Sequence, residues 1–466
     1  MHRNPTQPLV IAGVSCLMLV VGATRSDAQP QPPPSPLTLQ QAIRHAVDNY
    51  PAIVASMARV SAQEAGVDLA RTAYLPRLDY GVQINRATRN NVAGLLLPGA
   101  PIPSISGPVS DVTSSSSIWG SASGLLLSWE ALDFGLRGAT VGLAQAQVTR
   151  ARAGADLTQL EVGVRTADAF LRLAAAQETV RAARANVERQ DVFSNTVATL
   201  VRNDLRPGAD DSRARAELAF ARIQLIQAEQ AEQIARATLA QWLGVAPAAV
   251  QVAAGPLLQM PPPPPATAPA APAHPLAETQ MANVASSRAL QTVLGRSYLP
   301  RINFQSAFAA RGTGALANGA TLGGARGLFD FDAPNWAAGL TATFPLFDWF
   351  SVRERRRIEA ENERAELATY DRVVQELSSQ SEQARAEMDG ARRIAENTPI
   401  QLASARVLEQ QSRARYDAGL ATIIEVADSQ RLLLQAEVGD AVARLGVWRA
   451  LVTDAAARGD MSDLLR

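Results

Sequence analysis

The sequence has 466 residues, with 44 basic and 44 acidic side chains and only 5% aromatic residues. Because the charge is balanced, nothing in the composition points to nucleic acid as a partner. Abundant alanine and few aromatic residues favour long, closely packed helices over a bulky globular core.

The N-terminus has the features of an export signal. His2 and Arg3 precede an apolar run from Leu9 to Ala23, and Ser26-Asp27-Ala28 has the small-x-small pattern of a cleavage site. We expect residues 1–28 to be removed as a signal peptide. The alternative is an uncleaved membrane anchor, for which the apolar run is short.

The exported chain is poor in metal ligands. The single cysteine, Cys16, lies inside the apolar run and in a weak match to a lipidation motif, so its lipidation is left open. Without Cys16 the mature chain has no thiol, and its histidines are His45 and His274. The sequence therefore predicts no metal site and no cofactor.

The chain contains an internal repeat. Tyr74-Leu75-Pro76-Arg77 returns as Tyr298-Leu299-Pro300-Arg301, a shift of 298 − 74 = 224 residues. Leu132-Asp133-Phe134 returns as Phe347-Asp348-Trp349, a shift of 348 − 133 = 215 residues. We expect a first repeat over residues 37–255, a Pro/Ala-rich connector over 256–275 and a second repeat over 276–466. Within the connector, Pro261 to Pro275 is dominated by proline and alanine and is expected to be extended.

Each copy has a long segment in which small and apolar residues recur with helical spacing. These segments, 138–202 and 352–416, predict helices about 100 Å long, and Pro399 is expected to kink the second. Each long helix should turn into a second helix, which ends at Gly244 or Gly459. Half-length helices over 51–74 and 276–297 are expected to stack end to end on these. The spacing alone leaves open an ordinary soluble coiled coil.

After each Leu-Pro-Arg motif the pattern changes to a period of two, which predicts strands. Leu78, Tyr80, Val82 and Ile84 alternate with polar or small residues, and the second copy has the same pattern after Arg301. The later segments of both copies also alternate, which gives four strands in two hairpins. The loops of these hairpins, 99–117 and 312–326, are expected to face the cell exterior. Aromatic residues on the apolar faces are candidates for a membrane girdle: Trp119, Trp129, Trp336 and Phe344.

Four strands cannot close a barrel, and open sheet edges are not tolerated in lipid. Three copies of the chain would supply twelve strands, an even number within the range of known barrels. We therefore expect a homotrimer in contact with outer-membrane lipid. The alternative is a pair of exposed hairpins in a soluble sheet.

These motifs, in this order, resemble the TolC-like outer-membrane efflux protein family over nearly the whole mature chain. The resemblance also rests on Leu37-Thr38-Leu39-Gln40-Gln41-Ala42 and Tyr416-Asp417-Ala418-Gly419-Leu420. It implies a mainly helical, duplicated fold, in which a trimeric α-helical barrel in the periplasm continues into a twelve-stranded β-barrel. It further implies a passive export duct, opened at its periplasmic tip by an inner-membrane pump and a periplasmic adaptor.

The resemblance also assigns residues to the tip. It implies that the two helix turns form grooves for the adaptor and that four residues line the entrance. In place of the glycine usual in the first groove stands Asp204, and Ala421 stands where the family has an arginine, so that contact is expected to be absent or rebuilt. The groove residues are Asn203, Asp204, Leu205, Ala418, Gly419 and Leu420, and the entrance residues are Asp210, Tyr416, Glu425 and Asp428.

Two of the entrance residues suggest an electrostatic role. Three-fold symmetry would bring Glu425 and Asp428 of each subunit together in an acidic ring that favours cations. The alternative is that both are solvated acids on a helix surface.

The sequence contains no nucleotide-binding loop, nucleophile elbow or histidine–metal motif, so we predict that the protein is not an enzyme. The competing function is that of a soluble periplasmic coiled-coil adaptor or scaffold. Among exported cargoes we favour small molecules over proteins, on frequency alone.

Overall fold

The computed structural model describes residues 36–88, 97, 99–102, 115–261, 273–315, 322, 325, 328, 331 and 333–465. All of these belong to one compact unit, residues 33–466. The predicted signal peptide, residues 1–28, lies outside the described residues, as do residues 262–272 of the predicted connector.

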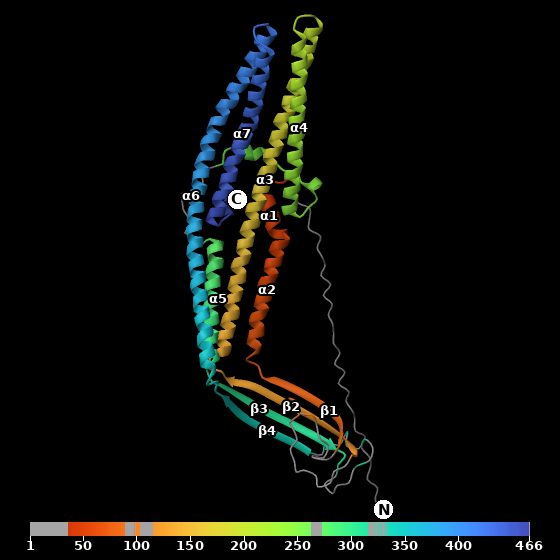
Figure 1. Cartoon of the computed structure of the whole chain (residues 1–466), viewed down its shortest axis with the longest axis vertical. Coiled ribbons are helices and arrows are strands. Elements are labelled where there is room, and N and C mark those ends of the chain that lie inside the picture. The colour runs from red at the N-terminus through yellow and green to blue at the C-terminus, as the bar shows by residue number, and fades with distance from the viewer. Residues whose placement is uncertain are drawn as a thin grey trace, which may run out of the picture. The chain divides into compact units, whose positions relative to one another are not determined.

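Two long helices dominate the structure (Figure 1). They have 67 and 70 residues, so each is about 100 Å long at 1.5 Å per residue. The second runs through Pro399 without ending there. The helix bounds are α1 Leu39–Asn49, α2 Pro51–Thr72, α3 Leu136–Arg202, α4 Gly208–Leu243, α5 Pro275–Ser297, α6 Asp348–Asp417, α7 Ile423–Arg458 and α8 Ser462–Leu465.

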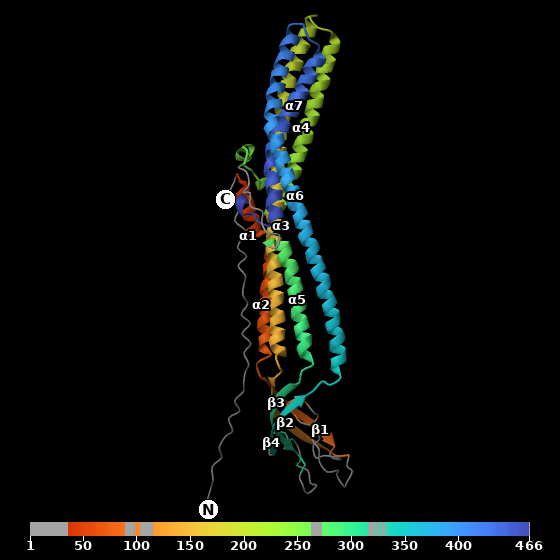
Figure 2. The same cartoon turned by 90° about the vertical axis from the view of Figure 1, so that its left-hand side faces the viewer.

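The shorter helices cover the long ones in pairs. Helices α2 and α4 pack along α3, whereas α5 and α7 pack along α6 (Figures 1 and 2). Helix α3 also contacts α5 and α7, which joins the two copies of the repeat. Buried alanines on α3, such as Ala167 and Ala174, allow these helices to approach closely. The expected end-to-end arrangement of half-length helices is confirmed.

The main core lies where α4 and α7 end beside the middle of α3. Phe170, Leu171 and Leu173 of α3 are fully buried there, together with Leu239 of α4 and Leu445 of α7. The segment before α1 contributes to this core, and Leu37 forms a parallel bridge with Val252. The residues directly before α1 and those after α4 are therefore packed against the helices.

The four strands form one antiparallel sheet in the order β1-β2-β3-β4. The two predicted hairpins are therefore joined by pairing between β2 and β3, so the two copies of the repeat share one sheet. Strands β1 and β4 are its edges within the described residues. The strand bounds are β1 Arg77–Thr88, β2 Ser117–Leu132, β3 Arg301–Thr313 and β4 Ala333–Thr343.

The register gives the sheet one apolar and one polar face. Because directly paired residues point to the same side, the apolar residues of β1 lie beside those of β2 to β4. One row across all four strands consists of Tyr80, Leu125, Phe308 and Trp336. The opposite face carries polar and small residues, among them Gln83, Asn303, Gln305, Ala337 and Thr341.

A compact hydrogen-bonded joint connects the sheet to the helices. Asp133, directly after β2, accepts hydrogen bonds from the backbone N–H groups of Gly135 and Arg137 at the start of α3. The Arg137 guanidinium pairs with Asp133 at 3.1 Å and stacks over the ring of Tyr74 at 4.8 Å. Trp129 donates to the Tyr74 carbonyl. Asp133 of the repeat motif therefore connects the end of β2 to the start of α3.

The expected bounds of the hairpin loops differ from the structure. Ser117 lies in β2, and Gly312 and Thr313 lie in β3, because pairing extends the strands beyond the period-two pattern. At the beginning of the predicted connector, Gly255–Leu258 forms a 3-10 turn, and Leu257 is buried in the main core.

The two copies provide a matched test of helix ends. Gly244 and Gly459 both adopt left-handed backbone angles after α4 and α7, with φ of 69° and 71°. A Cβ at Gly244 would meet open space, whereas one at Gly459 would lie 2.6 Å from Pro275 Cδ and 2.8 Å from His274 Cδ2. We predict that Gly244→Ala lowers the free energy of unfolding by about 1–2 kcal/mol and that Gly459→Ala lowers it further.

Denaturant unfolding followed by circular dichroism would measure both variants. Equal losses would contradict close packing between the end of α7 and the start of α5.

Candidate functional site

The two turns at the tip of the helices have the same backbone structure. Leu205 N–H donates to the Leu200 carbonyl, and Leu420 N–H donates to the Arg415 carbonyl. Both are bonds that close a helix C-terminus through a left-handed residue. That residue is Gly419 in one turn, with φ 76°, and Asp204 in the other, with φ 59°. Asp204 therefore adopts the left-handed backbone conformation that Gly419 adopts in the other turn.

Each turn exposes one leucine. The exposed fractions are 66% for Leu205 and 70% for Leu420, so both side chains are available to a partner. The neighbouring Asn203 donates to the Thr199 carbonyl and caps α3. Ala418 is the residue that ends α6. The structure thus gives all six predicted groove residues equivalent places in two similar turns, while their contact with an adaptor stays a prediction.

Tyr416 joins the two turns. Its side chain is fully buried, packs edge-on against Phe193 and donates a 3.0 Å hydrogen bond from its hydroxyl to Asp210 Oδ2. Arg206 approaches from the first turn, with its guanidinium 4.3 Å from the centre of the Tyr416 ring, and donates to the Tyr416 carbonyl. The structure therefore brings together Asp210 and Tyr416, two of the four residues that the resemblance assigned to the entrance.

Arg206 is the residue that sequence reasoning missed. Ala421, where the resemblance implies an arginine, is buried in the small tip core with Val197 and Ile423. Arg206 comes from the other helix turn, so alignment to the second turn could not find it. A usable signal was present, because Arg206 is the only arginine between Asp204 and Asp210.

Burial is the main cause that raises the pKa of Tyr416 to about 12. The hydrogen bond that Tyr416 donates to Asp210, and the negative charge of Asp210, raise this pKa as well. The positive charge of Arg206 opposes this shift. The neutral phenol is therefore the form that fits between the turns.

Glu425 and Asp428 lie on the first turns of α7, and the structure does not bring them into the Tyr416 cluster. Glu425 forms a capping box with Thr422, and its carboxylate lies 3.9 Å from Arg415. Asp428 pairs with Arg431 on the same helix. Within one subunit both carboxylates thus have ordinary helix-surface partners.

The four girdle candidates all lie on the apolar side of the sheet or directly beyond it. Trp119 stacks against Arg86 near the end of the sheet that is distant from the helices, and Trp129 lies near the helix joint. Trp336 lies in the same row as Leu125, through Phe308, and this row is between those of Trp119 and Trp129. Phe344 directly follows β4. Trp336 and Phe344 are strongly exposed. Their contact with lipid remains a prediction.

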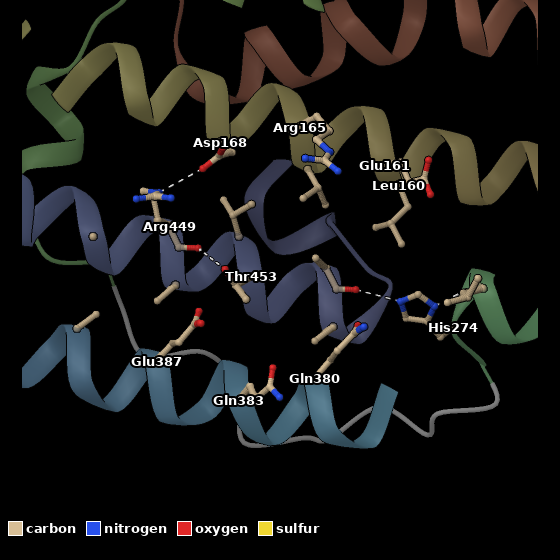
Figure 3. Close-up of a pocket in the computed structure, with 18 of the residues that line it drawn as sticks. Leu160, Glu161, Arg165, Asp168, His274, Gln380, Gln383, Glu387, Arg449 and Thr453 are labelled. Atoms are coloured by element: carbon tan, nitrogen blue, oxygen red, sulfur yellow. Dashed lines mark hydrogen bonds and ion pairs between the residues drawn. The ribbon is translucent and has the colours of Figure 1, made fainter. Parts of the chain in front are cut away.

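A cleft of about 1020 Å³ lies among the helices, and its lining includes none of the tip residues and none of the strand residues. It opens between α3, α6 and α7, close to His274 at the start of α5 (Figure 3). Asp168 and Arg449 pair across it at 3.2 Å, and His274 contacts the Ala456 carbonyl at 3.0 Å. These contacts connect α3 to α7 and α7 to α5, so the cleft marks the joint where α7 ends and α5 begins.

A sheet with two unlike faces, joined to a duplicated pair of long helices, defines the class of outer-membrane channel proteins. The chain belongs to the outer membrane efflux protein family, whose model matches residues 42–245 and 274–453. It is therefore an export channel protein of the outer membrane, with its helical part in the periplasm. Membership of this family argues against the alternative of a soluble adaptor.

Individual proteins agree with this assignment. Protein CyaE of Bordetella pertussis is 26% identical over 428 residues, which cover 86% of this chain and 80% of CyaE. The outer-membrane channel OprN is 21% identical, with a TM-score of 0.70 over 90% of this chain and 89% of OprN. The CmeC outer membrane channel of Campylobacter jejuni is 16% identical, with a TM-score of 0.73 over 90% of this chain and 85% of CmeC. OprN and CmeC share its fold.

No helix within the described part of the chain is long and apolar enough to cross a membrane.

The raised pKa of Tyr416 predicts a loss of stability in alkali. Its pKa is about 12 in the folded protein against 10.0 as the reference value, so the unfolded chain loses its proton first. The free energy of unfolding should therefore fall as the pH rises from 10 to 12, by up to about 3 kcal/mol. The sequence contains no lysine, so tyrosines dominate titration in this range.

The measurement is denaturant unfolding as a function of pH for the wild type and for Tyr416→Phe. The variant should lack most of the alkaline loss. Parallel curves for the two proteins would contradict a buried, neutral Tyr416.

Proposed function

We propose that three copies of this chain form a continuous passive duct from the periplasm through the outer membrane, opened at the tip by a periplasmic adaptor and an inner-membrane pump. The mature chain would begin after residue 28, with repeats over 37–255 and 276–466. The two-faced, four-stranded sheet carries the proposal. The family assignment supplies the channel class, and the proposal adds assembly, gating and cargo.

Assembly follows from the edges of the sheet. Strands β1 and β4 have no further strand beside them among the described residues, and the apolar face exposes large side chains. In lipid, unpaired backbone groups cost several kcal/mol each, so the edges must pair with other copies. Three copies of a four-stranded sheet would close a barrel of twelve strands, with the apolar face toward lipid and the polar face toward the pore.

The tip supports a closed resting state. Arg206, Asp210 and Tyr416 hold the turn after α3 against the turn after α6. We infer that these contacts keep the entrance narrow, with Arg206 in place of the arginine that is missing at position 421. Glu425 and Asp428 would add negative charge near the same entrance once three subunits meet. Leu205 and Leu420 would be the apolar contacts for the adaptor.

Two cargo classes fit this duct, small toxic molecules and secreted proteins. The family description, outer membrane efflux, favours small molecules. Deleting the protein in its host should sensitise the cells to part of a panel of toxic compounds and leave secretion of large proteins unchanged. Loss of a secreted protein with normal resistance would favour the second cargo class instead.

The tip contacts can be tested in planar bilayers. We predict that the Arg206→Ala/Tyr416→Phe double variant conducts more ions than the wild type, because both links between the turns are removed. Arg213→Ala is the control, since Arg213 lies on α4 near the tip but pairs only loosely with Glu217, at 3.9 Å.

Three results are informative. Pores of higher conductance in the double variant alone support the gate. Equal conductance in all three proteins would contradict it, and the absence of any pore would contradict the duct itself.

A further inference from the structure

A short turn between β1 and β2 folds back onto the polar face of the sheet. We call Leu97 and Gly99–Ile102 the folded-back turn. Gly99 and Ile102 exchange two backbone hydrogen bonds of 3.0 and 2.9 Å, so the four residues from Gly99 to Ile102 form a closed ring. Sequence analysis had placed this segment in a loop that faces the cell exterior, whereas these residues contact the strands.

The turn packs against two glycines on neighbouring strands. Gly81 on β1 and Gly124 on β2 are directly paired, and both belong to the polar face. A Cβ on Gly81 would lie 2.4 Å from Pro101 Cγ, and one on Gly124 would lie 2.1 Å from the Pro101 carbonyl oxygen. Any side chain at either position would displace Pro101, so the absence of side chains permits the contact.

Further contacts hold the turn in the same place. Gln83, two residues beyond Gly81 on the same face, donates a 2.9 Å hydrogen bond to the Leu97 carbonyl. Ile102 is buried against Ala122 of β2. The turn is thus bound by one polar and several apolar contacts to adjacent residues of β1 and β2.

The turn lies well inside the sheet. Gly81 is seven residues from the end of β1 at Thr88, which is about 24 Å along a strand. The side of the turn that faces away from the strands is apolar or small. Gly99 and Ala100 are exposed there, and Leu97 is 66% exposed. The remaining polar face of the sheet carries residues such as Asn303 and Gln305.

We propose that the folded-back turn is an apolar constriction inside the pore, which limits the cross-section of cargo independently of the periplasmic tip. This inference rests on the proposed duct, because only a closed barrel directs the polar face toward a shared pore. A barrel of eight strands is filled by side chains, whereas one of sixteen leaves an aqueous channel. A barrel of twelve strands would have an interior of intermediate width, and three such turns would occupy much of it.

The position of the turn can be tested by disulfide formation. The mature chain is predicted to have no cysteine, and a Cβ on Gly81 would lie 3.5 Å from Pro101 Cβ, within the range of about 3.5–4.5 Å for disulfides. We expect Gly81→Cys/Pro101→Cys to oxidise in outer membranes. Gly339→Cys/Pro101→Cys is the control, because Gly339 lies on the same face of the sheet but none of the described residues has an atom within 4 Å of its Cβ position. Absence of the first disulfide in folded protein would overturn the proposal.

The narrowing can be tested by conductance. Gly81→Val should displace the turn, and Gly339→Val is the matched control in the same sheet. Both are compared in the Arg206→Ala/Tyr416→Phe background, so that the tip does not limit the current. We expect a severalfold rise in conductance for Gly81→Val only. Reducing the disulfide of the Gly81→Cys/Pro101→Cys variant should also raise conductance.

Each outcome separates the constriction from the duct. Pores of equal conductance for Gly81→Val and Gly339→Val would overturn the constriction and leave the duct standing. Failure of every protein, including the wild type, to form pores would reject the proposed function instead. Trimers on gels before and after heating would show whether Gly81→Val has folded.

Discussion

The structure depends on a sheet that is incomplete within one chain. Its four strands have an apolar face with large exposed side chains, a polar face and two edges without partners among the described residues. Water could satisfy the edges but not the apolar face, whereas lipid could cover the apolar face but not the edges. Only association of several copies in a membrane satisfies both, and this requirement connects the fold to an export channel.

Duplication explains how one chain builds both ends of such a channel. Each copy supplies a long helix, two helices of 22 to 36 residues and two strands. The copies meet through β2–β3 pairing and through contacts of α3 with α5 and α7. The same duplication gives the tip two similar turns. The turns are not identical, because Asp204 occupies the position of Gly419 and only the first turn supplies an arginine to Tyr416. Asymmetry between the copies therefore lies at the tip, which we propose to be the entrance of the duct.

Much of the fold could be predicted because periodicity and the repeat act over long segments. The helices over 136–202 and 348–417 and the alternation after Arg77 and Arg301 follow local rules of spacing. Contacts between distant segments could not be predicted in this way. Arg206 contacts Tyr416, which lies 210 positions further along the chain. The packing of Pro101 on Gly81 and Gly124 depends on a loop whose sequence has no periodic pattern. Glycines at paired positions of two strands were the available indication of a close approach.

The number of subunits in the assembled protein tests the central claim most directly. Native mass spectrometry of protein extracted from the outer membrane in mild detergent would determine it. Our account predicts a complex of three mature chains that dissociates only when the sheet unfolds. A stable monomer that keeps its strands without detergent would show that the sheet needs no partner, and would contradict the account.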